Sequence, residues 1–438
     1  MAMMTSLLLS LLLHFIQFFF FPSLVASFSS SSSSSSIGAA RNHIKSTPHH
    51  DDDDDDVLWK MIRFFGIDMV DTSTNRFYYY CYPIDGECKH VHMPIRDLAA
   101  AWDATKALEF VNNHYMNTSN NDDDVMRVQQ QLTDAIKCTL SAYQSNLQIN
   151  GFDKGKYLHK DAIVEASTIG HSALLLLGIC DACKISILKH DDESIIHDIE
   201  GLVQGILSQQ LENGAFNIEF GSNNNNYLRG IEFYPGEAML SLMHAQQYVA
   251  MSTQQSILRA MEQAFAFYSS YYYNDEKIDV NYNIWQVLAF AKYYDALVDN
   301  NNNDDQSKRV EEVQRYVLDM CQEICQSRSW KYQLSRGQSF YPNIEVVEIV
   351  CGLDALAEGI RIARDLGEED TTTMFKMHAK HALYFIEWSQ SQVSDDCMVG
   401  KGGLGYGGVQ VFEQRLDITG HAISALGKLR SLSVLLPS

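Results

Sequence analysis

The fold of this chain is decided by the stretch "IEFYPGEAMLSLMHA", residues 231–245. The stretch begins with acidic and aromatic residues, which are followed by Tyr234-Pro235-Gly236-Glu237. The rest of the stretch consists mainly of small and large apolar residues. Proline at the first helical positions and glutamate in the first turn are typical of a helix start. The apolar residues that follow leave no polar face, which predicts a helix that is buried on all sides.

The same design recurs in five more segments, at residues 93–108, 164–179, 281–297, 341–360 and 415–429. Helices with one apolar stripe and an opposite charged face lie between them, at residues 123–143, 256–273, 307–325 and 372–389. A helix of the second kind covers a surface. Alternation of the two kinds predicts an all-α fold, an (α/α)6 toroid of helical hairpins with an inner and an outer ring. An open solenoid is the alternative, but the long, irregular connections favour closure.

The connections predict which end of this toroid carries the function. Those that lead into an inner-type helix are long and rich in glycine and aromatic residues, as at 211–238, 329–348 and 399–422. Several read as short strands or hairpins. One mouth, above the first turns of the inner helices, is therefore expected to be built by these loops, and binding residues usually lie on such loops over a rigid scaffold.

Composition bounds the class of protein. The chain has 438 residues, of which 46% are hydrophobic and 20% are charged, as is ordinary for a globular protein with a large core. Its formal net charge of −22 argues against a nucleic-acid partner, because neutralising phosphates requires clustered lysine and arginine.

The first 56 residues read as targeting and linking segments. Residues 1–27 hold a long apolar run followed by small residues, which predicts a signal peptide or an uncleaved signal anchor. Residues 28–56 are rich in serine and aspartate and are expected to be a disordered linker. A single toroid domain is expected over 57–438. A signal peptide and a signal anchor both place that domain in the secretory pathway, and membrane contact is expected only through the anchor. Asn117 is a candidate glycosylation site.

The nine cysteines predict one disulfide and no metal site. Cys81 and Cys88 flank the turn-like "YPIDGE" and could bridge the two arms of a hairpin. The pairs Cys180/Cys183 and Cys321/Cys325 have helical spacing on apolar faces and are expected to be core thiols. Cys81 and Cys88 with His90 and His92 lack the spacing of known zinc modules. The stretch "GKGGLGYGG" is no phosphate loop, and the sequence has no dinucleotide fingerprint, so no cofactor is expected.

Two repeat units, "GAFNIEF…FYPGEAMLSL" and "GGLGYGG…RLDITGHAISAL", resemble those of the six-hairpin glycosidase-like (α/α)6-toroid proteins. The resemblance extends over roughly residues 55 to 435 and lies in the pattern of the repeats. It implies a protein that acts on carbohydrates by hydrolysis, elimination or epimerisation with acidic residues in a central cleft. Because fold does not fix function, the implied activity is an analogy.

Four glutamates are candidate catalytic residues. Glu237 lies in a helix start, where it also has a purely structural explanation. Glu232 and Tyr234 precede that helix, have no capping role, and are therefore better candidates. Glu345 and Glu348 are three residues apart at another inner-helix start, where they could act as acid and base or complement the helix dipole.

Nine residues are candidates for binding a substrate: Tyr234, Trp285, Gln286, Tyr341, Tyr406, Arg415, Asp417, His421 and His171. The aromatic residues could stack on a sugar ring, or they could simply pack in the core or a loop. Arg415 could hold a uronate, or it could form an ordinary ion pair with Asp417, for which we expect a helix N-cap role. The two histidines occupy matching places in "STIGHSALL" and "DITGHAISAL", which repeat-derived packing also explains.

The leading functional hypothesis is a carbohydrate-active enzyme of the secretory pathway, either a glycoside hydrolase or a uronate epimerase or lyase. It would bind an oligosaccharide or polysaccharide and use paired carboxylates in the central cleft. The alternative is a non-catalytic toroid module that binds a glycan or a protein. Carboxyl groups about 5 to 10 Å apart across a pocket favour glycoside chemistry. Carboxylates that are all paired with arginine or helix N-termini favour the module.

Overall fold

The computed structural model describes residues 53–91, 93–115, 123–149, 155–158, 167–221, 228, 230–274, 280–299, 304–392, 402–405 and 413–434. All of them belong to the unit His50–Ser438. The expected signal segment, nearly all of the expected linker, Asn117 and Tyr406 lie outside the described residues.

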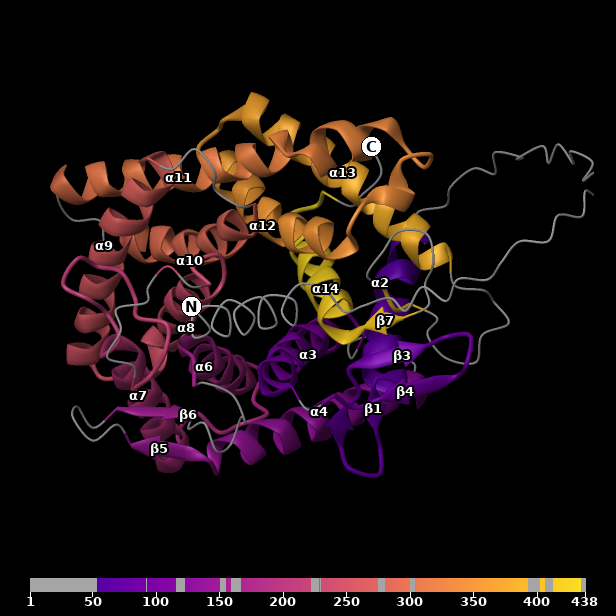
Figure 1. Ribbon diagram of the computed structural model, residues 1–438, viewed down its shortest axis with the longest axis horizontal. Coiled ribbons are helices and arrows are strands. Elements are labelled where there is room, and N and C mark those ends of the chain that lie inside the picture. The colour runs from indigo at the N-terminus through magenta and orange to yellow at the C-terminus, as the bar shows by residue number, and fades with distance from the viewer. Residues whose placement is uncertain are drawn as a thin grey trace, which may run out of the picture. The chain divides into compact units, whose positions relative to one another are not determined.

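Six helices in the described part of the chain form a closed inner ring (Figure 1). They are α3 (Pro94–His114), α6 (Ile169–Lys184), α8 (Tyr234–Ala245), α10 (Val280–Asp299), α12 (Val346–Asp365) and α14 (Leu416–Ser431). Each helix packs against the next one along the chain, and α14 packs back against α3. Ring closure excludes the open solenoid, and the six segments predicted to be buried on all sides are the six inner helices.

The outer layer consists of α2 (Asp53–Arg63), α4 (Asp123–Gln144), α7 (Glu193–Leu207), α9 (Met251–Asn274), α11 (Asp304–Gln326) and α13 (Glu369–Ser391). Each of them packs on an inner helix, as α4 does on α3 and α13 does on α12. Short helical turns join the layers at η1 (Phe64–Asp68), η2 (Gln246–Tyr248), η3 (Arg328–Gln333), η4 (Leu334–Arg336) and η5 (Tyr341–Asn343). Helix α2 begins inside the aspartate run.

Short strands occur in the loops, as the sequence predicts. β1 (Val70–Asp71) pairs with β2 (Arg76–Phe77), and β5 (Leu147–Ile149) pairs with β6 (Lys156–Leu158). A sheet with the order β4-β3-β7 joins β3 (Tyr80–Tyr82), β4 (Glu87–Lys89) and β7 (Gln414–Arg415), which directly precedes α14. This sheet ties the start of the toroid to its last inner helix.

The predicted hairpin disulfide is present between Cys81 and Cys88, which face each other across β3 and β4. The cysteines expected to be core thiols are free and buried: Cys180, Cys183, Cys321 and Cys325. Within the described part of the chain, no helix is long and apolar enough to cross a membrane.

Candidate functional site

The clearest polar cluster surrounds Asp417, the second residue of α14. Its Oδ1 accepts a hydrogen bond from Nε of Arg415 at 3.1 Å. Its Oδ2 accepts from both Arg415 (2.7 Å) and Arg96 of α3 (2.8 Å), and from the Tyr79 hydroxyl at 3.2 Å. Burial by itself would raise the pKa of Asp417, but the two guanidinium groups lower it to about 2. Asp417 is therefore ionised and held by groups from three parts of the chain.

Strand pairing builds this cluster. Tyr80 of β3 lies opposite Arg415 of β7, so Tyr79 and Arg415 are brought together at the start of α14. The Arg415 guanidinium lies 5.4 Å from the centre of the Tyr79 ring and donates to its hydroxyl at 2.6 Å. Arg415, and not Asp417, is the N-cap residue of α14. The N-cap expectation for Asp417 was wrong, because its side chain binds arginines instead of backbone N–H groups.

Glu237 lies in the first turn of α8 and is 6% exposed. Its Oε2 has no hydrogen-bond partner among the described residues. Burial raises the pKa of Glu237 to about 7, although the charge of Arg96 acts in the opposite direction. The neighbouring inner helix approaches closely at Gly170, where a Cβ would lie 2.5 Å from Oε2. Glu237 can therefore hold or release a proton near neutral pH.

Other buried polar atoms of the inner ring also lack partners among the described residues: Oδ2 of Asp103, Nε2 of His171, Oδ1 of Asn283, and both amide atoms of Gln286. Nδ1 of His171 lies 2.7 Å from the Thr168 hydroxyl, and burial lowers the pKa of this histidine to about 4. Burial also raises the pKa of Asp103 well above its usual value. Buried polar groups are normally hydrogen-bonded, so these atoms are suited to binding a polar ligand.

Two tryptophans lie in the middle of the ring. Trp102 of α3 and Trp285 of α10 stack with centroids 6.0 Å apart and planes at 28°. Because α3 and α10 are opposite each other in the sequence of inner-helix contacts, this pair spans the barrel axis. His421 of α14 meets the Trp285 ring edge-on at 6.1 Å, and the Trp102 indole donates to Asp181 at 2.8 Å. Trp285 and His421, two predicted site residues, are thus brought together.

The other predicted carboxylates are not joined to Glu237. Glu232 is half-buried just before α8 and has no hydrogen bond or ion pair within the described ranges. Glu345 is the exposed N-cap residue of α12. Glu348 accepts hydrogen bonds from Ser329 (2.8 Å) and Ser327 (3.5 Å). Their catalytic roles remain predictions.

Two of the three predicted tyrosines lie among the described residues, and they have different surroundings. Tyr341 is buried, and its ring packs edge-on against Phe385 (5.1 Å) and Trp388 (5.3 Å) of the outer helix α13. Tyr234 was predicted to precede the helix, but it is the first residue of α8, because the helix begins ahead of Pro235. It lies close to Gly170, where a Cβ would be 2.5 Å from its ring. Tyr234 therefore lies beside Glu237, whereas Tyr341 packs against the outer layer.

Sequence reasoning missed Arg96, Tyr79, Asp103 and Asn283. Asp103 could have been recognised, because it is a lone carboxylate within the apolar run "LAAAWDATKAL". Arg96 could also have been recognised, since it occupies the first turn of an inner-type helix. Tyr79 lies before the first inner helix, α3, and nothing in its sequence pattern marked it as a site residue.

No protein-family model and no curated protein matches the chain. Several solved structures are similar to it. A sugar epimerase from a ruminal bacterium is 13% identical, with a TM-score of 0.54, over 86% of this chain and 98% of that one. A D-mannose isomerase is 13% identical, with a TM-score of 0.51, over 89% and 99%. The cellobiose 2-epimerase of Spirochaeta thermophila is 10% identical, with a TM-score of 0.53, over 87% and 97%. At such identities the likeness shows the fold: this chain has the (α/α)6-toroid fold of the six-hairpin glycosidase-like proteins.

Proposed function

We propose that this protein is a carbohydrate-active enzyme of the secretory pathway that moves a proton on a sugar, as an epimerase or lyase does. The observation that carries this proposal is Glu237, a buried carboxyl with an unpartnered oxygen and a pKa of about 7. A general acid or base is most effective when its pKa lies near the working pH. The fold-level likeness to sugar epimerases and an isomerase supports the same chemistry.

Arg96 supplies the second part of the site. Its terminal nitrogen is paired with Asp417, while its buried Nε has no partner among the described residues. Such a donor can bind the oxygen of a sugar carbonyl or uronate carboxylate. If Glu237 removes the proton from the adjacent carbon, negative charge develops on that oxygen, and a fixed guanidinium stabilises it. After the planar intermediate has turned over in the site, Glu237 returns the proton to its other face and gives the epimer. Expulsion of a β-substituent with its bonding electron pair gives the elimination product instead.

Hydrolysis is less well supported by the described residues. It requires an ionised carboxylate opposite a protonated one. Asp417 is ionised, but both of its oxygens accept hydrogen bonds from arginine. Glu232, half-buried and without a partner in the described ranges, is the remaining candidate for a second carboxylate. The non-catalytic alternative is disfavoured by the Oε2 of Glu237, because this oxygen accepts no hydrogen bond from an arginine or a backbone N–H of the described residues, although the residue lies in the first turn of α8.

The test uses the full chain from a secreting eukaryotic host, incubated in D2O with a panel of neutral and uronate oligosaccharides. Proton NMR records both the exchange of a carbon-bound proton and the formation of new products. We expect exchange with the wild type, complete loss in Glu237→Gln, and no change in the matched control Glu369→Gln, whose exposed side chain lies in the first turn of α13. Exchange that survives Glu237→Gln overturns the assignment, and binding without exchange or cleavage identifies a module.

A further inference from the structure

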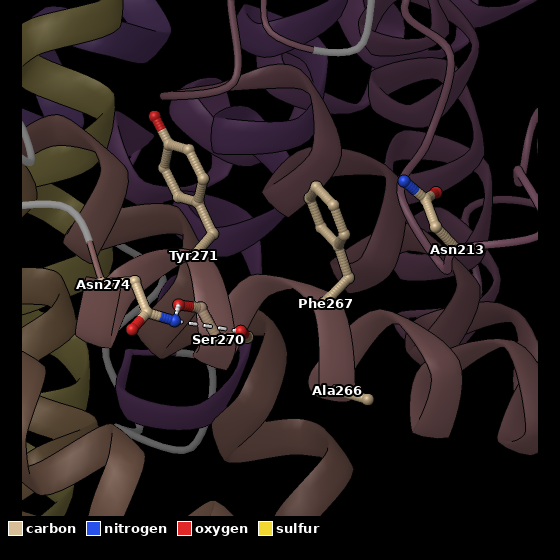
Figure 2. Close-up of a pocket in the computed structure, with 6 residues that line it drawn as sticks. All are labelled: Asn213, Ala266, Phe267, Ser270, Tyr271 and Asn274. Carbon is tan, nitrogen blue, oxygen red and sulfur yellow. Dashed lines mark hydrogen bonds between the residues drawn. The ribbon is translucent and has the colours of Figure 1, made fainter.

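A hollow of about 570 Å³ lies on the outer layer, and the site above does not use it. Figure 2 shows the rings of Phe267 and Tyr271 standing side by side on α9, with the Asn213 side chain pointing toward Phe267 from the loop after α7. The remaining lining residues are Ala266, Ser270 and Asn274. The volume lies within the range typical of small-molecule sites.

The wall opposite α9 is held rigidly. Gly214 has a φ of +91°, and a Cβ there would lie 2.2 Å from the Gln263 carbonyl oxygen, so the loop rests directly on the helix backbone. Nε2 of Gln210 donates to the Ala260 carbonyl at 2.8 Å. The N–H of Phe216 donates to the Tyr268 hydroxyl at 3.0 Å. The loop that carries Asn213 is therefore held against α9 by backbone contacts, and the other side of the hollow is formed by side chains of α9.

Its chemistry is that of a site for an uncharged sugar. The Phe267 and Tyr271 rings are almost parallel, with planes at 13° and centroids 6.5 Å apart. Such rings present flat apolar surface to the C–H face of a pyranose. The Asn274 carboxamide donates to the carbonyl (2.7 Å) and the hydroxyl (3.2 Å) of Ser270, and the Asn213 Oδ1 accepts from the Ala215 N–H at 3.1 Å. The Asn274 Oδ1, the Asn213 Nδ2 and the Ser270 O–H are left to bond sugar hydroxyls. No charged side chain lines the hollow among the described residues. An acidic sugar would find no counter-charge there.

The hollow lies near the mouth of the toroid. Asn274 ends α9 shortly before α10 begins, so this end of α9 lies on the side where the inner helices start. The Tyr271 ring is 5.7 Å from the ring of Tyr282 in the first turn of α10, and Asn283 with its buried unpartnered Oδ1 comes next. The rim of the mouth and the inner ring are in contact here.

We propose that this hollow is an accessory site that binds a neutral sugar residue of an oligosaccharide at the rim of the mouth. The class of ligand rests on the proposed function, whereas the site itself rests on the hollow. The uncharged rim site and the arginine-containing inner site would bind different parts of one chain, a neutral residue outside and the reacting residue inside.

The test measures binding of maltotriose, cellotriose, mannotriose and trigalacturonic acid to the full chain by calorimetry and saturation-transfer NMR. Wild type is expected to bind at least one neutral trisaccharide. Tyr271→Ala should weaken that binding about tenfold. Ala266→Trp, which fills the hollow without removing any packing, should weaken it likewise. Tyr384→Ala removes an exposed tyrosine from α13 and serves as the matched control.

Three results would overturn the accessory site: wild type binds none of the neutral sugars, trigalacturonic acid binds more tightly than they do, or both hollow variants bind like wild type. Proton exchange measured on the same variants separates the two proposals. If the hollow variants catalyse proton exchange and bind sugars like wild type, the proposed enzymatic function is supported and the accessory site is refuted. If wild type binds a neutral sugar, the hollow variants bind it more weakly, and no protein catalyses exchange, the accessory site is supported and the proposed enzymatic function is refuted.

Discussion

Glu237 is expected to make the protein less stable as the pH rises through neutrality. Its usual pKa is 4.5, and burial raises it to about 7 in the folded protein. Between these values the folded chain keeps a proton that the unfolded chain has released, so the free energy of unfolding falls with increasing pH. This contribution is fully present below 4.5 and is lost once the pH exceeds about 7. The difference corresponds to about 3 kcal/mol.

Glu237→Gln keeps the shape of the protonated carboxyl and removes its titration. The variant should match wild type near pH 4.5 and exceed its free energy of unfolding by about 3 kcal/mol at pH 8. Urea denaturation followed by circular dichroism, at one-unit steps of pH between these limits, measures both curves. Glu369→Gln controls for the loss of an exposed first-turn carboxylate and should run parallel to wild type.

The deciding quantity is the difference in free energy of unfolding between wild type and Glu237→Gln, plotted against pH. The contributions of all other titrating groups cancel in this difference. A difference that stays constant within about 1 kcal/mol across the range would show that Glu237 is ionised and hydrated in the folded protein. The reasoning that makes it the proton-transfer group would then fail together with the stability argument.

Three further predictions concern its neighbours. Asp417→Asn leaves Arg415 and the partly exposed Arg96 without their shared carboxylate, and should lower the free energy of unfolding by about 2 to 4 kcal/mol in urea at pH 7; a loss below about 1 would contradict it. Arg96→Met removes a charge that lowers the pKa of Glu237, so the midpoint of the pH–rate profile should move upward, and an unmoved midpoint would refute the coupling. Gly170→Ala should cost about a hundredfold in turnover by displacing Glu237, whereas Gly427→Ala, whose Cβ would meet nothing closer than 3.8 Å, should leave turnover unchanged.

The sequence predicted the ring of helices well, because a helix without a polar face and a helix with one stripe have different places in a layered fold. The segment 231–245 became α8, and each of its five counterparts became another inner helix. The Cys81–Cys88 bridge was also predictable, since a short turn separates the two cysteines. These features depend on residues that are neighbours in sequence.

The site was less predictable because its contacts are long-range. Tyr79 and Asp417 bond across 338 positions, and only the pairing of β3 with β7 brings them together. Glu237 reads as an ordinary helix start in sequence, and the close approach of Gly170 on another helix is what buries its oxygen. Neither the depth of a carboxyl nor its lack of a partner can be read from its own segment.

The dipeptide Tyr-Pro occurs in two of the six repeats but does not mark the same structural position in both. Tyr234-Pro235 begins α8 itself, whereas Tyr341-Pro342 forms the separate turn η5, and α12 starts only at Val346. The same two residues therefore occupy different depths in the two repeats. Tyr341 consequently reaches the outer helix α13 instead of the inner ring.

The tryptophan pair across the barrel axis determines how a ligand can enter and leave the toroid. With Trp102 stacked on Trp285, and Lys106 and His244 bonded to Asp181 beside them, the ring is sealed part-way along its length. A molecule that reaches the level of these rings must leave by the opening through which it came. On the proposed function, the substrate would therefore enter and the product would leave through the same mouth of the toroid.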